Sequence, residues 1–410
     1  MSHYAYVIAG GGTAAGYAAR ELAARGAGPG EVALVSEEPV LPYHRYPLSK
    51  AYLTQRVPLD VFLVNRPHFY EDTGIETRLR AKISELDTEG SALRLENADT
   101  VTYEKLLIAT GSKPLKFRCA GADSQRLYYL RDIADAQAIR TQAETSETAV
   151  LIGGGFTGLE LSASLCRMGV KVTLVCLENR LMPFLFTERM NEFFLRLYEE
   201  RGVTMALSQT VSRFADAAGG GIEVQLESGE GLKVDFAVAG IGVEPAVDIV
   251  EGTPIHVDDG IYVNEFLETS VPGVWAAGDV ANCPDLIYGR RRRGEHMQNA
   301  RDQGICASRN MTGLRQEYRG VPYYFSEFFE YKWEFWGDVL DCDEVLYVGD
   351  LEHGTFSTWW ICQGLVRAAF VMGRVDEERT RARLCVQEQR EAPQDIRQRA
   401  HTDVETHAGT

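Results

Sequence analysis

The chain has 410 residues, of which 45% are hydrophobic, and it carries a formal net charge of −17 at pH 7. This length suits two or three domains with packed cores, and the acidic balance argues against nucleic acid and anionic membranes as partners, because both attract basic surfaces. No apolar stretch approaches the ~20 residues that span a bilayer, and the N-terminus runs directly into a predicted core strand, so we expect a cytoplasmic protein without a signal peptide.

The first predicted element is a strand over Tyr4–Ala9, followed by a glycine-rich loop and a helical pattern. In such a loop one glycine permits the tight turn, a second lets the backbone approach a pyrophosphate, and a third small residue lets helix and strand pack closely. The residues expected to bind a dinucleotide here are Gly10, Gly12, Thr13, Ala14 and Ala15, with Ala15 in the third position. The next strand, Val32–Val35, leads to Glu38, about 20 residues past the loop, where a ribose-binding carboxylate is expected.

The following segment, Pro42–Leu53, contains no cysteine. Enzymes that relay electrons through a dithiol need a reactive cysteine pair in this place. The eight cysteines of the chain are scattered, without a C-x-x-C pair or metal-ligand spacing: Cys119, Cys166, Cys176, Cys283, Cys306, Cys342, Cys362 and Cys385. We therefore predict neither dithiol–disulfide chemistry nor a bound metal.

A second loop of the same design follows the strand Ala149–Ile152, about 140 residues after the first. Its expected binding residues are Gly153, Gly155, Phe156, Thr157 and Gly158. After the strand Val172–Val175 comes Glu178, which would bind the ribose hydroxyls of NADH and repel the 2′-phosphate of NADPH. Arg180 is nearby but stands alone, so NADPH is the less favoured alternative. Two dinucleotide units in one chain predict a flavin and a nicotinamide, and hence an electron-transfer enzyme.

Several motifs resemble those of the FAD-dependent pyridine nucleotide oxidoreductases. They are Pro42–Leu53, Leu107–Ser112, Tyr129–Arg131, Ala239–Pro245, Ala276–Val280 and Glu295–Ala300. That family includes ferredoxin and rubredoxin reductases, apoptosis-inducing-factor-like proteins and monodehydroascorbate reductases. Leu181–Thr187 and the pair Arg292 and Arg293 are most similar to the monodehydroascorbate reductase branch. The resemblance covers Tyr4 to Cys385 and implies an α/β fold of the glutathione-reductase-like kind, with two Rossmann-like dinucleotide-binding domains and a C-terminal α+β domain.

The same resemblance implies a split flavin domain. Residues 1–113 would begin the FAD-binding domain and residues 245–320 would complete it. An NAD(P)H-binding domain at residues 114–244 would be inserted between them. Pro114 and Pro245 mark the two crossovers, since proline favours such turn boundaries.

The chain changes character beyond this point, where aromatic and β-branched residues predict a C-terminal α+β domain over residues 321–390. Phe356–Cys362 and Leu365–Met372 have the pattern of a β-hairpin. A helix is expected over residues 376–390. Residues 391–410 are polar and charged, and we expect them to form a flexible tail.

At the reacting centre the resemblance implies a lysine and a carboxylate. Lys50 is similar to the family's lysine near the flavin N5, and Glu160 resembles the partner that a buried lysine needs to stay charged. From the residues alone, Lys50 could equally be a solvated helix lysine. Arg45 and Arg131 resemble arginines that bind the flavin nucleotide, since the guanidinium fork suits a diphosphate. Asp279 resembles the acid on the ribityl chain, with a helix N-cap as the alternative.

The other cofactor residues that the resemblance implies lie in short motifs around the two nucleotides. They are Ile83, Thr110, Gly111, Gly242, Glu295, His296 and Met297. Glu295 and His296 resemble the loop at the contact between nicotinamide and flavin, although His296 could equally be a hydrogen-bonded structural histidine. No acid–base constellation is expected, because the cofactors carry the difficult steps.

On the acceptor side, Arg301 matches an arginine near the acceptor of monodehydroascorbate reductases. Phe325 takes the place of an aromatic residue beside the flavin, which is tyrosine in that branch and tryptophan in the ferredoxin reductases. By composition alone Phe325 would be a core residue, and it lacks the hydroxyl that could bond a polar acceptor. Glu327 replaces an arginine of the branch and would repel an anion. Both departures weigh against the ascorbate radical as the acceptor.

We predict an FAD-dependent NADH oxidoreductase that passes electrons to a small acceptor, with monodehydroascorbate or a similar radical or quinone-like molecule as the best candidate. One alternative is an NADH-dependent ferredoxin or rubredoxin reductase. The basic run Arg290–Arg293 could bind such an acidic electron-transfer protein, although a charge run is more often a solvated face. The other alternative is a flavoprotein redox sensor like apoptosis-inducing factor.

Overall fold

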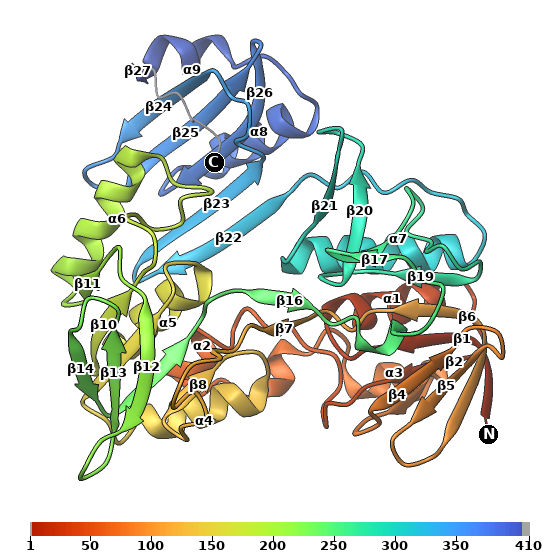
Figure 1. Ribbon diagram of the computed structural model, residues 1–410. Coiled ribbons are helices and arrows are strands. Elements are labelled where there is room, and N and C mark those ends of the chain that lie inside the picture. Colours follow the sequence, from red (N-terminus) through yellow and green to blue (C-terminus); the bar gives the residue numbers. More distant parts are fainter. Residues whose placement is uncertain (1, 404–410) are drawn as a thin grey trace. The chain divides into compact units, whose positions relative to one another are not determined.

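The computed structural model describes residues 2–403, which divide into two compact units (Figure 1). The first unit holds residues up to 47, 57–113 and 243–320, and the second holds 48–56, 114–242 and the residues from 321 onward. Two of the passages between the units, after Lys113 and before Val243, fall at the short paired strands β7 (Ser112–Pro114) and β16 (Val243–Pro245). Within the described residues, no helix is both long and apolar enough to cross a membrane.

The first unit is built on a seven-stranded sheet in the order β3-β2-β1-β6-β5-β4, with β19 also paired to β6. Its strands are β1 (Ser2–Ala9), β2 (Val32–Val35), β3 (Glu76–Arg78), β4 (Ile83–Asp87), β5 (Ala92–Leu95), β6 (Thr100–Ile108) and β19 (Val274–Ala276). Strand β1 pairs in parallel with β2 and β6, whereas β4 and β5 form an antiparallel hairpin. Every residue of β2 is buried, as expected for a parallel strand that is covered on both faces.

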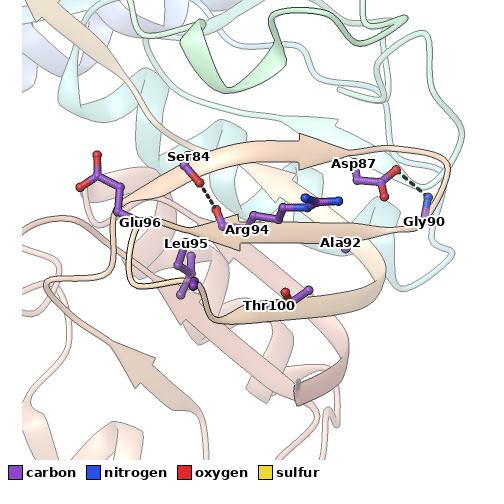
Figure 2. A pocket seen from close by; sticks show the side chains of 9 residues that line it. Ser84, Asp87, Gly90, Ala92, Arg94, Leu95, Glu96 and Thr100 are labelled. Atoms are coloured by element: carbon purple, nitrogen blue, oxygen red, sulfur yellow. Dashed lines mark hydrogen bonds between the residues drawn. The ribbon is translucent and has the colours of Figure 1, made fainter.

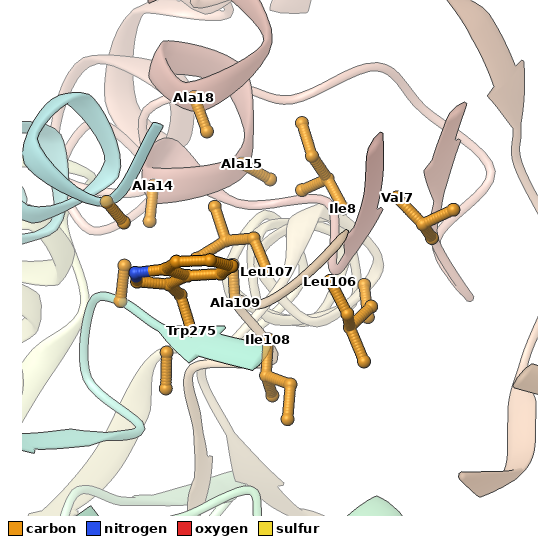
Figure 3. Packing of buried hydrophobic residues seen from close by; sticks show 14 of the residues in the cluster. Val7, Ile8, Ala14, Ala15, Ala18, Leu106, Leu107, Ile108, Ala109 and Trp275 are labelled. Carbon is orange, nitrogen blue, oxygen red and sulfur yellow. The ribbon is translucent and has the colours of Figure 1, made fainter. Parts of the chain in front are cut away.

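Two helices of the first unit pack against each other, α1 (Thr13–Ala24) and α7 (Met297–Met311). A small residue makes this close packing possible, because a Cβ at Gly304 of α7 would overlap the backbone of Ala14 on α1. Ala14 and Ala15 are buried and also lie near the indole of Trp275 and the end of β6 (Figure 3). The unit also holds η1 (Leu59–Phe62), α3 (Pro67–Thr73), η2 (Asp248–Val250) and a small sheet of β17 (Val257–Asp258), β18 (Gly260–Tyr262), β20 (Ala281–Asp285) and β21 (Arg290–Arg293).

The second unit repeats the parallel design in a five-stranded sheet of order β11-β10-β9-β15-β8. These strands are β8 (Leu127–Tyr129), β9 (Thr148–Ile152), β10 (Lys171–Val175), β11 (Thr204–Ala206) and β15 (Phe236–Ala239). The helices are α2 (Ala51–Gln55), α4 (Ile133–Ala143), α5 (Phe156–Arg167) and α6 (Glu188–Glu200), and β12 (Val211–Asp216), β13 (Ile222–Leu226) and β14 (Gly231–Val234) form an antiparallel meander.

A six-stranded sheet completes the second unit, in the order β22-β23-β26-β25-β24-β27. Its elements are β22 (Tyr323–Phe328), β23 (Tyr331–Gly337), β24 (Glu344–Asp350), β25 (Thr355–Cys362), β26 (Leu365–Met372), α8 (Asp376–Gln387), α9 (Gln394–Arg399) and β27 (His401–Asp403). The predicted hairpin is confirmed, because β25 and β26 pair in antiparallel register across a two-residue turn. The predicted fold class is also confirmed: each unit has a sheet with parallel central strands and a glycine loop after one of them, and the second unit also contains the antiparallel C-terminal sheet.

The C-terminal segment differs from the expected flexible tail over residues 391–403. Helix α9 lies within that range, and its Ile396 is fully buried in a cluster with Val386 and Trp359. The polar composition hid this anchor, because one buried side chain is enough to hold a short amphipathic helix on a sheet. The rest of the predicted tail, residues 404–410, lies outside the described residues.

Candidate functional site

The two glycine loops have the same backbone geometry in the two units. Gly10 has φ +139° and Gly153 has φ +115°, in the region that favours glycine. A Cβ at Gly10 would overlap the carbonyl oxygen of Ala109, and one at Gly153 would overlap that of Gly240. Each loop therefore turns tightly against the backbone that follows a neighbouring strand, and a side chain at either position would open the turn.

The middle of each loop is open where a phosphate would approach. A Cβ at Gly12 or Gly155 would meet no described atom within 4 Å. These two glycines are the N-caps of α1 and α5, and no described side chain caps either helix. The first N–H groups of each helix therefore remain available for an anion, which the helix dipole also favours. This backbone cradle fits one dinucleotide pyrophosphate in each unit.

The third small position differs between the loops in an informative way. A Cβ at Gly158 would overlap the carbonyl oxygen of Gly153, so that only glycine fits. Ala15 is fully buried in the first loop, so its methyl group is accommodated there. The first loop has a further restriction that the motif did not reveal, because a Cβ at Gly11 would overlap the hydroxyl of Ser36.

The predicted ribose acid of the first unit lies with the predicted diphosphate arginine. Glu38 forms an ion pair with Arg45 and accepts a hydrogen bond of 2.8 Å from the hydroxyl of Tyr43. Arg45 also donates to Tyr43 at 3.0 Å. This network holds the Arg45 guanidinium and the Glu38 carboxylate side by side after the end of β2. A phosphate could bind the guanidinium there, and a ribose could bind the carboxylate.

Asp279 follows β19 and accepts a hydrogen bond of 2.8 Å from Ser112. It does not cap a helix, because β20 comes next, so the N-cap alternative is wrong. Thr110 bonds the carbonyl of Ala246 at 2.7 Å, and Gly111 has φ +74°. Ile83 starts β4 and is partly buried against the core of the first unit.

The segment before α7 places Glu295, His296 and Met297 in sequence at the start of the helix. His296 is the N-cap, and its Nδ1 accepts from the backbone N–H of Gln298 at 3.5 Å. Glu295 forms an ion pair with Arg293, and burial raises the pKa of Glu295 even though Arg293 opposes that shift. Arg301 lies one turn into α7, where its Nε bonds Asp302 at 2.8 Å. His296 thus has the structural role that the sequence left open, and a role toward a cofactor stays a prediction.

In the second unit, Glu160 is the centre of a buried hydrogen-bond network. Its carboxylate lies 2.5 Å from Nζ of Lys50 and accepts hydrogen bonds of 2.5 Å from Ser49 and Ser326. The side chains of Lys50 and Glu160 are only 17% and 10% exposed, so Lys50 is not a solvated helix lysine. The sequence analysis missed Ser49 and Ser326, because they lie 111 and 166 residues from Glu160 along the chain.

The other predicted residues of the second unit lie around α5 and β10. Phe156 stacks on Tyr324 and Trp333 with ring centroids 5.8 Å apart in both pairs, so its ring packs between α5 and the C-terminal sheet. Thr157 is the next residue of α5. Glu178 is exposed beyond the end of β10, where its carboxylate could meet a ribose, while Arg180 bonds the carbonyl of Pro183 at 3.4 Å.

Three remaining predicted residues lie in loops or strands of the second unit. The backbone N–H of Arg131 donates to Asp135 at 2.8 Å, and Gly242 has φ +112°. Phe325 lies in β22, opposite Glu334 of β23 in the antiparallel register. Glu327 faces two cations, with Arg167 and Lys332 each 3.6 Å away.

The basic run on β21 is largely engaged within the first unit. Arg292 pairs with Asp285 at 3.0 Å, and Arg293 pairs with Asp259 at 2.8 Å. Arg291 donates to the carbonyl of Val263 at 2.7 Å. These partners offset much of the positive charge that a protein partner could use.

The described cysteines are all unpaired. Burial raises the pKa of Cys166 to about 11 and that of Cys176 to about 12. Burial likewise raises the pKa of Cys342 to about 12. Thiols with such pKa values stay protonated at neutral pH, and only the thiolate is the nucleophile.

A surface pocket also lies on the hairpin of the first unit, between β4, β5 and β6 (Figure 2). Its walls carry Ser84, Asp87, Arg94 and Thr100, and Ser84 bonds the backbone carbonyl of Arg94 at 3.1 Å. None of the predicted site residues lines this pocket. The cofactor sites therefore rest on the two loops rather than on this hollow.

Comparison with known proteins gives two family matches. Residues 4–304 match the pyridine nucleotide-disulphide oxidoreductase family. Residues 321–405 match the C-terminal domain described as monodehydroascorbate reductase 3-like.

The chain is also similar along its length to curated and solved proteins. It is 37% identical over 401 residues to the seedling isozyme of monodehydroascorbate reductase from Cucumis sativus, with 92% of each chain covered. It is 38% identical, with the same coverage, to the cytosolic monodehydroascorbate reductase 4 of Oryza sativa subsp. japonica. Among solved structures, the ferredoxin reductase for the CYP199A2 system of Rhodopseudomonas palustris matches with a TM-score of 0.92 and 28% identity, covering 98% of both chains.

Proposed function

The chain belongs to the pyridine nucleotide-disulphide oxidoreductase family, and on that premise we propose that it moves electrons from NADH through FAD to monodehydroascorbate or a similar small radical or quinone-like acceptor. The observation that carries the proposal is the repeated loop: one chain has two cradles of the same geometry, at Gly12 and Gly155, each open at the start of a helix. FAD, when bound, supplies the redox chemistry by taking a hydride and releasing electrons. No cysteine lies in the segment where a dithiol relay would need one.

We assign FAD to the first unit. The cradle around Gly12 would hold the pyrophosphate, with Arg45 and Glu38 at the adenosine side. Asp279, positioned by Ser112, would bind the ribityl chain. Lys50 would present its ammonium to the flavin, held by Glu160.

We assign NADH to the second unit, with preference over NADPH. The exposed carboxylate of Glu178 would accept hydrogen bonds from the ribose hydroxyls and repel a 2′-phosphate. Arg180, the nearby cation that could offset this repulsion, already bonds the carbonyl of Pro183. These two features support the preference.

Two observations favour a small acceptor: the identity of the curated relatives, and the pairing of the β21 arginines within the first unit. Both curated relatives described above are monodehydroascorbate reductases. Reduction of a ferredoxin or rubredoxin is the second candidate, favoured by the similarity to a ferredoxin reductase. The arginines of β21 that such a partner would need are largely paired within the unit. The redox-sensor alternative has no specific observation in its favour.

The experiment compares Arg301→Ala with Arg94→Ala, a variant of an arginine on β5 whose side chain is 58% exposed. Steady-state turnover is measured with NADH and monodehydroascorbate, a quinone or a ferredoxin, together with stopped-flow reduction of the flavin. Arg301→Ala should raise the KM for monodehydroascorbate by about tenfold, as for the loss of one charged hydrogen bond, and leave flavin reduction unchanged. If only ferredoxin supports turnover, and that turnover collapses with salt, the small-acceptor proposal is wrong.

A further inference from the structure

Three aromatic rings gather in the first unit, outside the residues that the motifs identify. Tyr17 lies on α1, and His44 and Tyr46 lie in the loop after β2. The centroid of the His44 ring is 6.0 Å from that of Tyr17 and 5.8 Å from that of Tyr46. Tyr46 is 41% exposed, so that this small cluster reaches the surface of the unit.

Two guanidinium groups accompany the rings. Arg20 sits over the ring of Tyr17 at 4.9 Å and is fixed by a 2.7 Å hydrogen bond to Asn65. Arg301 on α7 is close enough for its charge to act on His44, as does that of Arg20. Asp302 pairs with Arg301, so the cluster keeps a positive balance.

The imidazole of His44 has one nitrogen whose hydrogen-bonding capacity is not used within the described residues. Its Nδ1 is buried and has no hydrogen-bond partner among the described residues. Burial lowers the pKa of His44, and the charges of Arg20 and Arg301 lower it further. The ring is therefore neutral near pH 7 and can donate or accept a hydrogen bond there.

Flat aromatic faces, a cation and a hydrogen-bonding imidazole suit a small planar ring that carries a negative charge. Resting on the function proposed above, we propose that Tyr17, His44 and Tyr46 form a binding subsite beside Arg301 for a planar, anionic ring acceptor. Stacking would orient the ring, Arg301 would pair with its charge, and His44 and Tyr46 would supply polar contacts.

The subsite has a pH dependence whose sign follows from its charges. The groups around His44 are Tyr17 and Arg20 from α1, Arg301 with its partner Asp302 from α7, and Tyr46 from its own loop. As the pH falls through the lowered pKa of His44, the imidazole gains a proton and adds positive charge. An anionic acceptor should then bind more tightly, provided that its own charge does not change over that range.

The test uses the FAD-loaded enzyme and the variants His44→Gln, Tyr46→Leu and Tyr46→Phe. His68→Gln, at an exposed position of α3, is the matched control. The acceptors are monodehydroascorbate, generated enzymatically from ascorbate, and neutral p-benzoquinone. His44→Gln and Tyr46→Leu should each raise the KM for monodehydroascorbate about fivefold, the typical value of one stacking or hydrogen-bonding contact. Tyr46→Phe, which keeps the ring, should have a smaller effect.

The same variants should leave the KM for NADH and the rate of flavin reduction unchanged. His44→Gln should also abolish the fall in acceptor KM at acid pH, which a merely structural role would not affect. Equal KM values for monodehydroascorbate in all variants would overturn the subsite.

Direct binding separates this inference from the proposed function. If the unmutated enzyme does not reduce monodehydroascorbate, the proposed function fails, and calorimetric titration with ascorbate still tests the subsite. Binding of ascorbate that weakens in His44→Gln and not in His68→Gln supports the subsite. No binding, or binding that both variants retain, refutes it.

Discussion

Replacing Glu160 with glutamine should destabilise the second unit far more than the loss of a surface ion pair. The substitution keeps a side chain of similar size near Ser49 and Ser326, but it removes the negative charge beside the buried ammonium of Lys50. Removing one partner of a buried pair costs about 3–5 kcal/mol, because the other charge is left uncompensated. Since Lys50 keeps 17% of its side-chain surface in contact with solvent, we expect about 3 kcal/mol, at the low end of that range.

Smaller changes around the same carboxylate should have graded effects. Ser326→Ala removes one hydrogen bond to a charged group and should cost about 1.5 kcal/mol. The double variant Lys50→Met with Glu160→Gln removes both charges. Its loss of unfolding free energy should be about 2 kcal/mol smaller than the sum of the losses in the two single variants, since residues in contact couple strongly.

The assay is urea unfolding of the FAD-loaded protein, followed by tryptophan fluorescence and by release of flavin. The control is Glu144→Gln, which breaks the ion pair with Arg56 in the same unit, where the two side chains are 39% and 71% exposed. Such a surface pair should contribute less than about 1 kcal/mol. If Glu160→Gln were no more harmful than this control, or if the double-variant cycle were additive, the reasoning about the buried network would be refuted.

Three further predictions address the cofactors and the C-terminal sheet. Gly12→Val should abolish FAD binding, because the branched side chain fills the open cradle, whereas Gly155→Val should spare FAD content and weaken NADH binding; flavin absorbance and NADH titration would show both. Glu178→Ala should narrow the kcat/KM preference for NADH over NADPH by roughly 5- to 150-fold, the equivalent of about 1–3 kcal/mol for a charged hydrogen bond; equal values in the unmutated enzyme would contradict the assignment. Burial opposes a lower pKa at Glu378, but hydrogen bonds from Arg374 and Ser357 lower that pKa nevertheless. The ionised carboxylate therefore stabilises the fold at pH values above the ordinary pKa of a glutamate, and this stabilisation is lost as the pH falls through the lowered pKa. Thermal unfolding of Glu378→Gln should accordingly differ most from that of the unmutated protein at neutral pH, and the two should converge as the pH falls through the lowered pKa of Glu378.

Local patterns in the sequence were enough to predict the parallel sheets and the loops. Each loop is specified by neighbouring residues, and the clash of any side chain at Gly10 or Gly153 with a backbone carbonyl explains why glycine is required. The hairpin of β25 and β26 was predictable for the same reason, because Gln363 and Gly364 form a turn between two β-branched and aromatic runs. Strong local signals of this kind survive without knowledge of tertiary contacts.

The partners of the charged residues could not be predicted in the same way. Ser326 reaches Glu160 across 166 residues of sequence, and no local pattern marks a serine as the donor to a distant carboxylate. The basic run on β21 shows the converse. Its arginines formed a patch in the sequence, but Arg292 and Arg293 have acidic partners on neighbouring strands and loops. Side-chain pairing across a fold depends on register and burial, which composition does not contain.

The same limit changes how Glu327 should be interpreted. In the sequence it was an acid in place of an arginine, and therefore an obstacle to an anionic acceptor. In the structure its carboxylate lies 3.6 Å from both Arg167 and Lys332, so these three side chains carry one net positive charge. At such distances the potential near Glu327 depends on the group of three and not on the acid alone. The substitution therefore gives much weaker grounds against an anionic acceptor than the sequence implied, and the lost hydroxyl at Phe325 becomes the departure that matters.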